Sequence, residues 1–87
     1  PEVRQGRNPA ALYELGLCHA RVKDYRRAVE CFELVREIDP DHLDCLYNLG
    51  VCSKALSRAT FRDYFRQYLD RAPESWWARV ALEVLRS

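Results

Sequence analysis

Four cysteines and two histidines are the side chains of this chain that could bind a metal, form a disulfide or act as a nucleophile. They are Cys18, Cys31, Cys45, Cys52, His19 and His42. The sequence contains no Cys-x-x-Cys pair, and the two histidines are not spaced as ligands of one ion. Because structural zinc sites are built from such closely spaced ligands, we expect neither a metal nor a cofactor.

The even number of cysteines could indicate a disulfide framework, but each cysteine lies within a helix-like apolar pattern and not in a predicted loop. Cys45 and Cys52 would lie about 10.5 Å apart along one helix, which is farther than a disulfide allows. We therefore expect reduced cysteines that line the core as small apolar side chains. A bridge between Cys18 and Cys31, across one helical hairpin, stays open.

The sequence lacks the common catalytic patterns. It has no Gly-x-Ser-x-Gly, no glycine-rich phosphate loop and no His-Glu-x-x-His. Cys18 and His19 come nearest to a nucleophile and its base, but neighbouring residues of a helix point about 100° apart. We also expect Cys18 to be buried, so the sequence predicts a protein that is not an enzyme.

Arginines at four-residue spacing could bind an acidic segment or a nucleic acid. They are Arg58, Arg62 and Arg66, with Arg71 nearby. Acidic residues stand between them, and the chain as a whole has 14 basic and 13 acidic residues, a net charge of +1. This balance favours a solvated helix face, and we expect no nucleic-acid partner.

Length and composition fit one small globular domain or a piece of a larger protein. The chain has 87 residues, of which 48% are hydrophobic and 31% charged, and only three are glycine. So few glycines argue against a β-protein with many tight hairpins. The longest stretch without a charge, 45–53, has nine residues, whereas a membrane-spanning helix needs about 20, so we expect no membrane partner.

The compartment stays open. The first residues carry neither an initiator Met nor the apolar core of a signal peptide, which suggests a fragment or a processed product. The cysteines that we expect to be reduced and buried favour the cytoplasm.

An internal repeat organises the chain. Residues 12–18, Leu-Tyr-Glu-Leu-Gly-Leu-Cys, match residues 46–52, Leu-Tyr-Asn-Leu-Gly-Val-Cys, at five of seven positions. Gly16 and Gly50 therefore occupy equivalent positions. Similarity at a period of about 34 residues indicates a solenoid of stacked helical units, and the two glycines suggest places where a neighbouring helix leaves no room for a side chain.

Apolar residues at helical spacing, separated by capping residues, predict five helices in antiparallel pairs. In the first helix this apolar stripe includes Leu12, Leu15 and Gly16. The expected starts of the helices are Asn8, Asp24, Asp41, Ser57 or Thr60, and Ser75, with Pro40 and Pro73 after the second and fourth helices. The last helix should run from Trp76 to about Arg86.

This pattern resembles the tetratricopeptide repeat. The residues that carry the resemblance are Leu12, Leu15, Gly16, Tyr25, Ala28, Phe32 and Pro40 in the first unit, and Leu46, Leu49, Gly50, Phe65 and Pro73 in the second. The resemblance implies an all-α superhelix of stacked antiparallel helix pairs. It divides the chain into a flank (1–8), two repeats (9–42 and 43–75) and a capping helix (76–87).

The sequence also departs from the family pattern. The second unit is one residue short, because Pro73 stands one position earlier than an exact repeat of Pro40 would place it. Phe61 stands where Ala28 stands in the first unit, and we expect its ring to push the two helices of the second unit apart or to change their crossing. Glu83 takes the place of a third glycine, which suggests a terminal cap. Pentatricopeptide repeats have a similar period and bind RNA, but they fit these residues poorly.

In this family the first helix of each pair lines a concave surface that takes peptides. The resemblance therefore implies partner-binding residues at Tyr13, Leu17, Tyr47, Asn48, Val51 and Trp77, in a row that also holds Ala81 and Val84. The alternative is that these residues only pack helix against helix. Of the positions that grip a carboxylate in some members, only Asn48 matches, so we expect a more apolar peptide.

The last helix is apolar around nearly its whole circumference, so we expect part of it to be covered by more chain, a second copy or a partner. Together these observations predict a protein–protein interaction module, an adaptor or scaffold. The alternative is a stacking element of a larger solenoid that has no ligand of its own and could self-associate through this helix.

Overall fold

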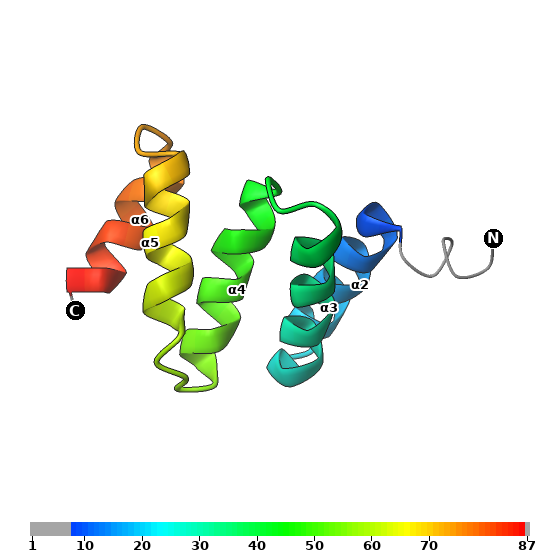
Figure 1. Ribbon diagram of the computed structural model, residues 1–87. Coiled ribbons are helices and arrows are strands. Elements are labelled where there is room, and N and C mark those ends of the chain that lie inside the picture. Colours follow the sequence, from blue (N-terminus) through cyan, green and yellow to red (C-terminus); the bar gives the residue numbers. More distant parts are fainter. Residues whose placement is uncertain (1–7, 87) are drawn as a thin grey trace.

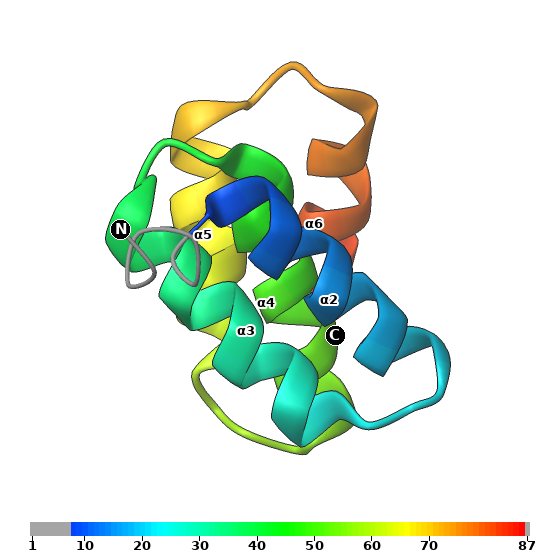
Figure 2. The same cartoon turned by 90° about the vertical axis from the view of Figure 1, so that its right-hand side faces the viewer.

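The computed structural model describes residues 8–86, which form five α-helices joined by short turns. They are α2 (Pro9–Arg21), α3 (Tyr25–Ile38), α4 (Leu43–Ala55), α5 (Phe61–Arg71) and α6 (Trp76–Arg86). Each helix packs against the next one in the chain, which produces a stack with α2 and α3 at one end and α6 at the other (Figure 1). Seen from the first end, α2 and α3 lie nearest the viewer (Figure 2). The all-α class and the stacked helix pairs are confirmed.

Three of the predicted helix caps form as expected. The Asn8 side chain accepts hydrogen bonds from the backbone N–H groups of Ala10 and Ala11 at 2.9 and 3.3 Å. Asp24 Oδ1 accepts from the Arg27 N–H at 3.3 Å. The Ser75 hydroxyl accepts from the Ala78 N–H at 3.1 Å, and α6 begins at the next residue, Trp76. All but the last residue of the predicted flank 1–8 lies outside the described residues.

The predicted cap at Asp41 is wrong. His42 caps α4 instead, because its Nδ1 accepts a hydrogen bond from the Cys45 N–H at 3.1 Å. The Asp41 carboxylate is occupied elsewhere, 2.7 Å from the Arg71 guanidinium. Thr60 directly precedes α5, as one of the two predicted starts, but its side chain makes no capping hydrogen bond.

The turn after the first helix of each unit repeats with the period of the sequence. Lys23 and Ser57 both have positive φ, 65° and 59°. After each of them, the next N–H reaches back to a carbonyl five residues earlier, from Asp24 to His19 at 2.8 Å and from Arg58 to Ser53 at 2.9 Å. This is the Schellman arrangement, which satisfies carbonyls at the helix end and usually contains glycine. The two units therefore turn in the same way.

The missing residue of the second unit lies between this turn and α5. Arg58 stands at the position equivalent to the capping Asp24, and an arginine cannot accept hydrogen bonds from the start of a helix. Hydrogen bonds between residues three apart in the sequence form the start of α5 instead, as in a 3₁₀ turn. The Phe61 N–H donates to the Arg58 carbonyl at 3.1 Å, and the Asp63 N–H donates to the Thr60 carbonyl at 3.0 Å. As a result, α5 is shorter than α3.

Both central glycines mark close helix contacts, as predicted. A Cβ atom on Gly16 would lie 2.6 Å from the Phe32 ring, and one on Gly50 would lie 2.8 Å from the Phe65 ring. Because the two distances are nearly equal, Phe61 does not push α4 and α5 apart where Gly50 meets Phe65, so the expected separation of the two helices is wrong there. Its half-buried ring instead lies near the cations of Lys54 and Arg62.

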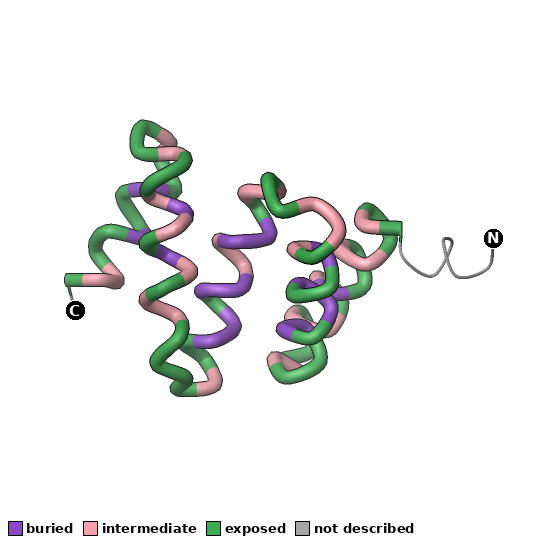
Figure 3. Tube along the Cα trace, in the orientation of Figure 1, coloured by how far each residue is buried: buried purple, intermediate pink, exposed green. Residues whose placement is uncertain are grey.

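The buried residues are concentrated on the inner helices of the stack (Figure 3). One cluster joins α3 to α4 and includes Val29, Phe32, Val35, Cys45 and Leu49. A second cluster joins α4 and α5 to α6 and includes Leu46, Phe65, Tyr68, Ala78 and Ala81. The buried residues therefore form two clusters between successive helices rather than one central core.

The four cysteines are free thiols. Cys31, Cys45 and Cys52 are buried, as expected, but the prediction for Cys18 is wrong because its side chain is exposed. The Cys45 thiol donates a hydrogen bond to the Phe32 carbonyl at 3.0 Å. Burial raises the pKa of Cys45 to about 12 and that of Cys52 to about 11, so both remain thiols at neutral pH.

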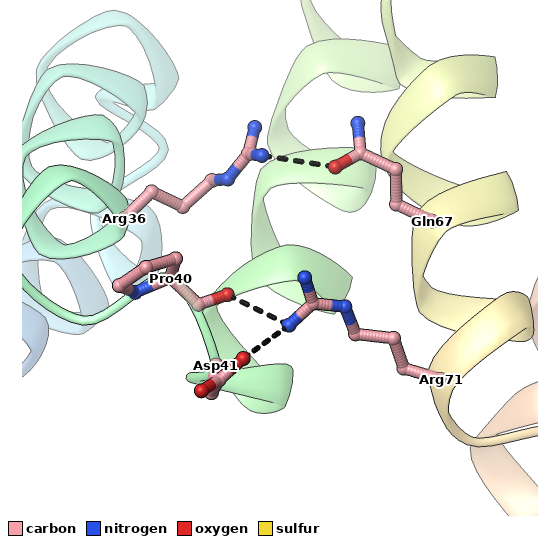
Figure 4. A network of polar contacts seen from close by, with 5 residues as sticks. All are labelled: Arg36, Pro40, Asp41, Gln67 and Arg71. Atoms are coloured by element: carbon pink, nitrogen blue, oxygen red, sulfur yellow. Dashed lines mark hydrogen bonds and ion pairs between the residues drawn. The ribbon is translucent and has the colours of Figure 1, made fainter.

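Polar contacts connect α5 to α3 and to the turn that follows α3 (Figure 4). Arg36 donates to Gln67 Oε1 at 2.9 Å, while Arg71 pairs with Asp41 and donates to the Pro40 carbonyl at 3.1 Å. Arg71 therefore serves the interface rather than a free basic stripe. None of the helices in residues 8–86 combines the length and the apolar character needed to span a membrane.

Candidate peptide-binding groove

The predicted site residues come from α2, α4 and α6, the first helices of the two units and the last helix. The structure gathers four of them, Tyr13, Tyr47, Asn48 and Trp77, around one pocket of about 230 Å³. Asp44 and Tyr68 complete its lining. The repeat explains this placement, because Tyr13 and Tyr47 occupy equivalent positions on their helices.

A hydrogen bond across the two units fixes the polar side of this pocket. Asn48 Nδ2 donates to the Tyr13 hydroxyl at 2.9 Å and to the Asp44 carbonyl at 2.9 Å. The Tyr13 ring packs on His42, with the ring centroids 4.6 Å apart. These contacts hold the Tyr13 hydroxyl and the Asn48 amide side by side.

The same geometry leaves hydrogen-bonding capacity open at the pocket. Burial, together with the nearby Asp44 carboxylate, raises the pKa of Tyr13 to about 12, so its hydroxyl keeps its proton at neutral pH. Within residues 8–86 no acceptor takes this proton and no donor reaches Asn48 Oδ1. The pocket therefore offers one donor and one acceptor to a ligand, which is what a peptide group requires.

Aromatic rings form the other wall. The Tyr47 ring contacts those of Trp77 and Tyr68, with centroid separations of 4.8 and 5.6 Å. Trp77 in turn stacks on Trp76 at 3.9 Å. Burial, and secondarily the neighbouring Tyr68, raises the pKa of Tyr47. Such rings supply large contact areas with little conformational freedom to lose.

A second hollow of about 360 Å³ shares Tyr47 with the first. Its lining is mostly apolar: Tyr47, Val51, Lys54, Ala55, Phe65, Val80 and Val84. Val51, another predicted site residue, is exposed here. Tyr47 is common to both hollows, so α4 presents two adjacent depressions of different polarity. We call the two hollows together the groove.

Two residues of the predicted row do not line the groove. Leu17 packs, partly buried, against the core cluster between α3 and α4. Ala81 is fully buried in the cluster around Phe65. The helical wheel alone did not distinguish these two from the others, because the packing of the neighbouring helix decides which residues are covered.

Two residues of the first hollow were not predicted. Asp44 lies four residues before Asn48 and so on the same helix face, a spacing from which it could have been found. Tyr68 belongs to α5, and no repeat position pointed to it. Among the residues that line the first hollow, only Asp44 carries a formal charge. Its carboxylate would repel an anionic ligand and attract a cationic one.

The comparison with protein families agrees with this geometry. The model of the tetratricopeptide repeat matches residues 9–42, which contain α2 and α3. These residues are therefore similar to a tetratricopeptide repeat. Repeats of this family generally mediate protein–protein interactions and are generally not enzymes. A search of the curated proteins found no match to the chain.

Proposed function

We propose that the chain is a non-enzymatic interaction module, an adaptor or scaffold element, that binds a partner peptide or helix in the groove. One observation carries the proposal: Tyr47 forms a wall common to a polar and an apolar hollow and is held by Trp77 at 4.8 Å. A site already fixed by such contacts loses little freedom on binding, which favours affinity.

We further propose that 43–75 is a second tetratricopeptide repeat and 76–87 a capping helix. The close approach of Gly50 to Phe65 and the left-handed turn at Ser57 repeat those at Gly16 and Lys23, which supports the first part. Glu83 supports the second part. It stands at the equivalent glycine position of α6, where its side chain would obstruct a helix packed as closely as α5 packs on α4.

The polarity of the groove favours a particular ligand. The second hollow suits an apolar side chain, whereas the Tyr13 hydroxyl and the Asn48 amide suit a main-chain peptide group. The Asp44 carboxylate favours a Lys or Arg near that group and disfavours a terminal carboxylate. We therefore expect an apolar peptide flanked by a basic residue.

A peptide array followed by affinity measurements tests the groove. Tyr47→Ala and Trp77→Ala should each weaken the best peptide by about tenfold or more, as expected for central aromatic anchors. Leu82→Ala is the matched control, because Leu82 is an exposed apolar residue of the same helix and lines neither hollow. Circular dichroism checks that the variants keep their helices. Equal affinity of the wild type, Tyr47→Ala and Trp77→Ala would exclude the groove as the site.

The second candidate function is self-association of a stacking element through α6. It is favoured by the exposed Trp76, Val80 and Leu82 on that helix. Light scattering of the wild type and of Trp76→Glu over a range of concentrations tests it. Self-association predicts a mass that rises with concentration and returns to that of the monomer in Trp76→Glu, whereas a folded monomer throughout would exclude it.

A further inference from the structure

The free side of α2 carries an uncovered apolar row that is separate from the groove. Its members are spaced by three and four residues and so lie on one face of the helix: Ala11, Leu15, Cys18 and Val22. All four are exposed, Leu15 by 47% and Val22 by 74%. Figure 2 looks onto this end of the stack, where α2 and α3 lie in front.

The equivalent row on α4 is covered. It consists of the counterparts of those four residues in the second unit, namely Cys45, Leu49, Cys52 and Leu56. The first three of these are at most 1% exposed, and the whole row packs in the cluster formed with Val29, Phe32 and Val35 of α3. In the second unit, therefore, an amphipathic helix, α3, covers the row that is exposed in the first unit.

At this end of the stack, part of α3 also differs in polarity from the corresponding part of α5 in the second unit. In the second unit, Tyr64 and Gln67 of α5 meet α3 through polar contacts, the Tyr64 hydroxyl donating to Glu33 at 2.9 Å and Gln67 accepting from Arg36 at 2.9 Å. Once the missing residue of the second unit is allowed for, the counterparts of Gln67 and Arg71 on α3 are Leu34 and Ile38. Leu34 is 40% exposed, so the corresponding strip of the first unit is apolar.

We propose that this end face, formed by the α2 row together with Leu34 and Ile38, binds an amphipathic helix of a partner protein. The helix packs as α3 packs on α4 and α5. Its contact side carries apolar residues like those of α3. Apolar residues also replace Glu33 and Arg36, because Cys31 and Leu34 stand in the first unit where their partners Tyr64 and Gln67 stand in the second, and offer no hydroxyl or amide. This surface is additional to the groove and does not depend on it.

A second copy of the chain fits this face less well. Its own uncovered helix, α6, carries exposed charged residues between its exposed apolar ones, namely Arg79, Glu83 and Arg86. Packing α6 on the end face would bring these charges against an apolar surface and remove them from water, which is unfavourable without compensating partners. The partner helix is therefore expected to be uncharged on its contact side.

The test uses two helical peptides made from residues 24–39 of this chain, each stapled on its solvent side and carrying Cys31→Ala. The first peptide also carries Glu33→Leu and Arg36→Leu, while the second keeps both charges. Fluorescence anisotropy measures binding, and alkylation of the exposed Cys18 reports whether the end face is covered. We expect saturable binding of the first peptide, with Cys18 alkylated severalfold more slowly, and weaker binding of the second.

Variants of the protein locate the binding site. Leu15→Asp and Val22→Asp change exposed residues of the row, and each should reduce affinity for the first peptide by about tenfold or more. Val51→Asp is the matched control in the groove and, like Tyr47→Ala, should bind this peptide as the wild type does. The proposal for the groove and the proposal for the end face can therefore be disproved independently of each other.

Three results would overturn the proposal. The first is unchanged affinity in both Leu15→Asp and Val22→Asp while circular dichroism shows intact helices. The second is equal or tighter binding of the charged peptide, because this contradicts an apolar contact side. The third is a Cys18 that is protected in concentrated protein alone and becomes reactive on dilution, because a second copy would then occupy the face.

Discussion

The Ser53 hydroxyl lies in the last turn of α4, in a residue that is 1% exposed, and forms no hydrogen bond within the described chain. A buried polar group without a partner costs about 1–3 kcal/mol. Because Ser53→Ala removes this group, it should raise the free energy of unfolding by about 1 kcal/mol or more, measured by chemical denaturation.

Alanine also favours helices more than serine does, so a control must separate the two effects. Ser53→Cys provides it, because cysteine and serine have similar helix propensities and a buried thiol tolerates the absence of a partner. This variant should also be more stable than the wild type. If neither variant gained stability, the Ser53 hydroxyl would have a partner in solution.

Gly50 controls how closely α4 and α5 approach each other. A Cβ atom there would lie 2.8 Å from the Phe65 ring, so Gly50→Ala should lower the free energy of unfolding by about 1–3 kcal/mol despite the better helix propensity of alanine. A double-mutant cycle with Phe65→Leu tests the cause, because the smaller side chain should remove most of the additional cost. Additive effects of the two changes would exclude the clash.

The turns that end α2 and α4 hold Lys23 and Ser57 in the left-handed region, which disfavours residues other than glycine by about 1 kcal/mol. Lys23→Gly and Ser57→Gly should each stabilise the fold by up to about that amount, measured by thermal or chemical unfolding. Lys23→Ala is the control and should leave stability nearly unchanged, because alanine experiences the same strain. A destabilised Lys23→Gly would mean that the lysine side chain stabilises the turn.

The helices were largely predictable from the sequence because their signals are local. Asn8, Asp24 and Ser75 act as caps through bonds to residues two or three positions later. The cap at His42 was not predictable, because histidine is an uncommon capping residue and Asp41 stands beside it. The start of α5 was uncertain for a similar reason, since no acidic residue follows directly after the turn at Ser57.

Exposure was predictable only where both neighbours of a helix are known. The stripe on the first helix correctly indicated an apolar face, but Leu15 and Cys18 are exposed because no helix of residues 8–86 covers that side. In the groove, the resemblance to the tetratricopeptide repeat indicated Tyr13, Tyr47 and Asn48. It could not indicate Tyr68, which approaches from the second helix of a pair.

For the molecule as a whole, stability should decrease at high pH. Burial raises the pKa of Tyr13 and of Tyr64 to about 12, from 10.0, and that of Cys45 also to about 12, from 9.0. The folded state thus holds these protons more tightly than the unfolded state does. The contribution to stability is complete below the unfolded pKa values and is lost as the pH rises through the folded ones.

Urea denaturation between pH 7 and 11 measures this effect. The free energy of unfolding should change little due to these groups up to about pH 8 and then decrease steadily from about pH 9. Tyr64→Phe should make the decrease shallower above about pH 10 and leave the dependence near neutral pH as it is. A wild-type stability that stays constant up to pH 11 would contradict the tight retention of these protons.

The bonds between α3 and α5 bear on how the molecule comes apart. Arg36 bonds to Gln67 and Tyr64 bonds to Glu33, which joins α3 to α5, while Arg71 of α5 pairs with Asp41 in the turn between α3 and α4. Loss of α3 would therefore deprive α5 of two polar partners and α4 of its buried face at once. In a stack with so few units, each interface is a large share of the total. The two units should accordingly melt in a single cooperative transition, with hydrogen exchange fastest at α6, which lies at the end of the stack.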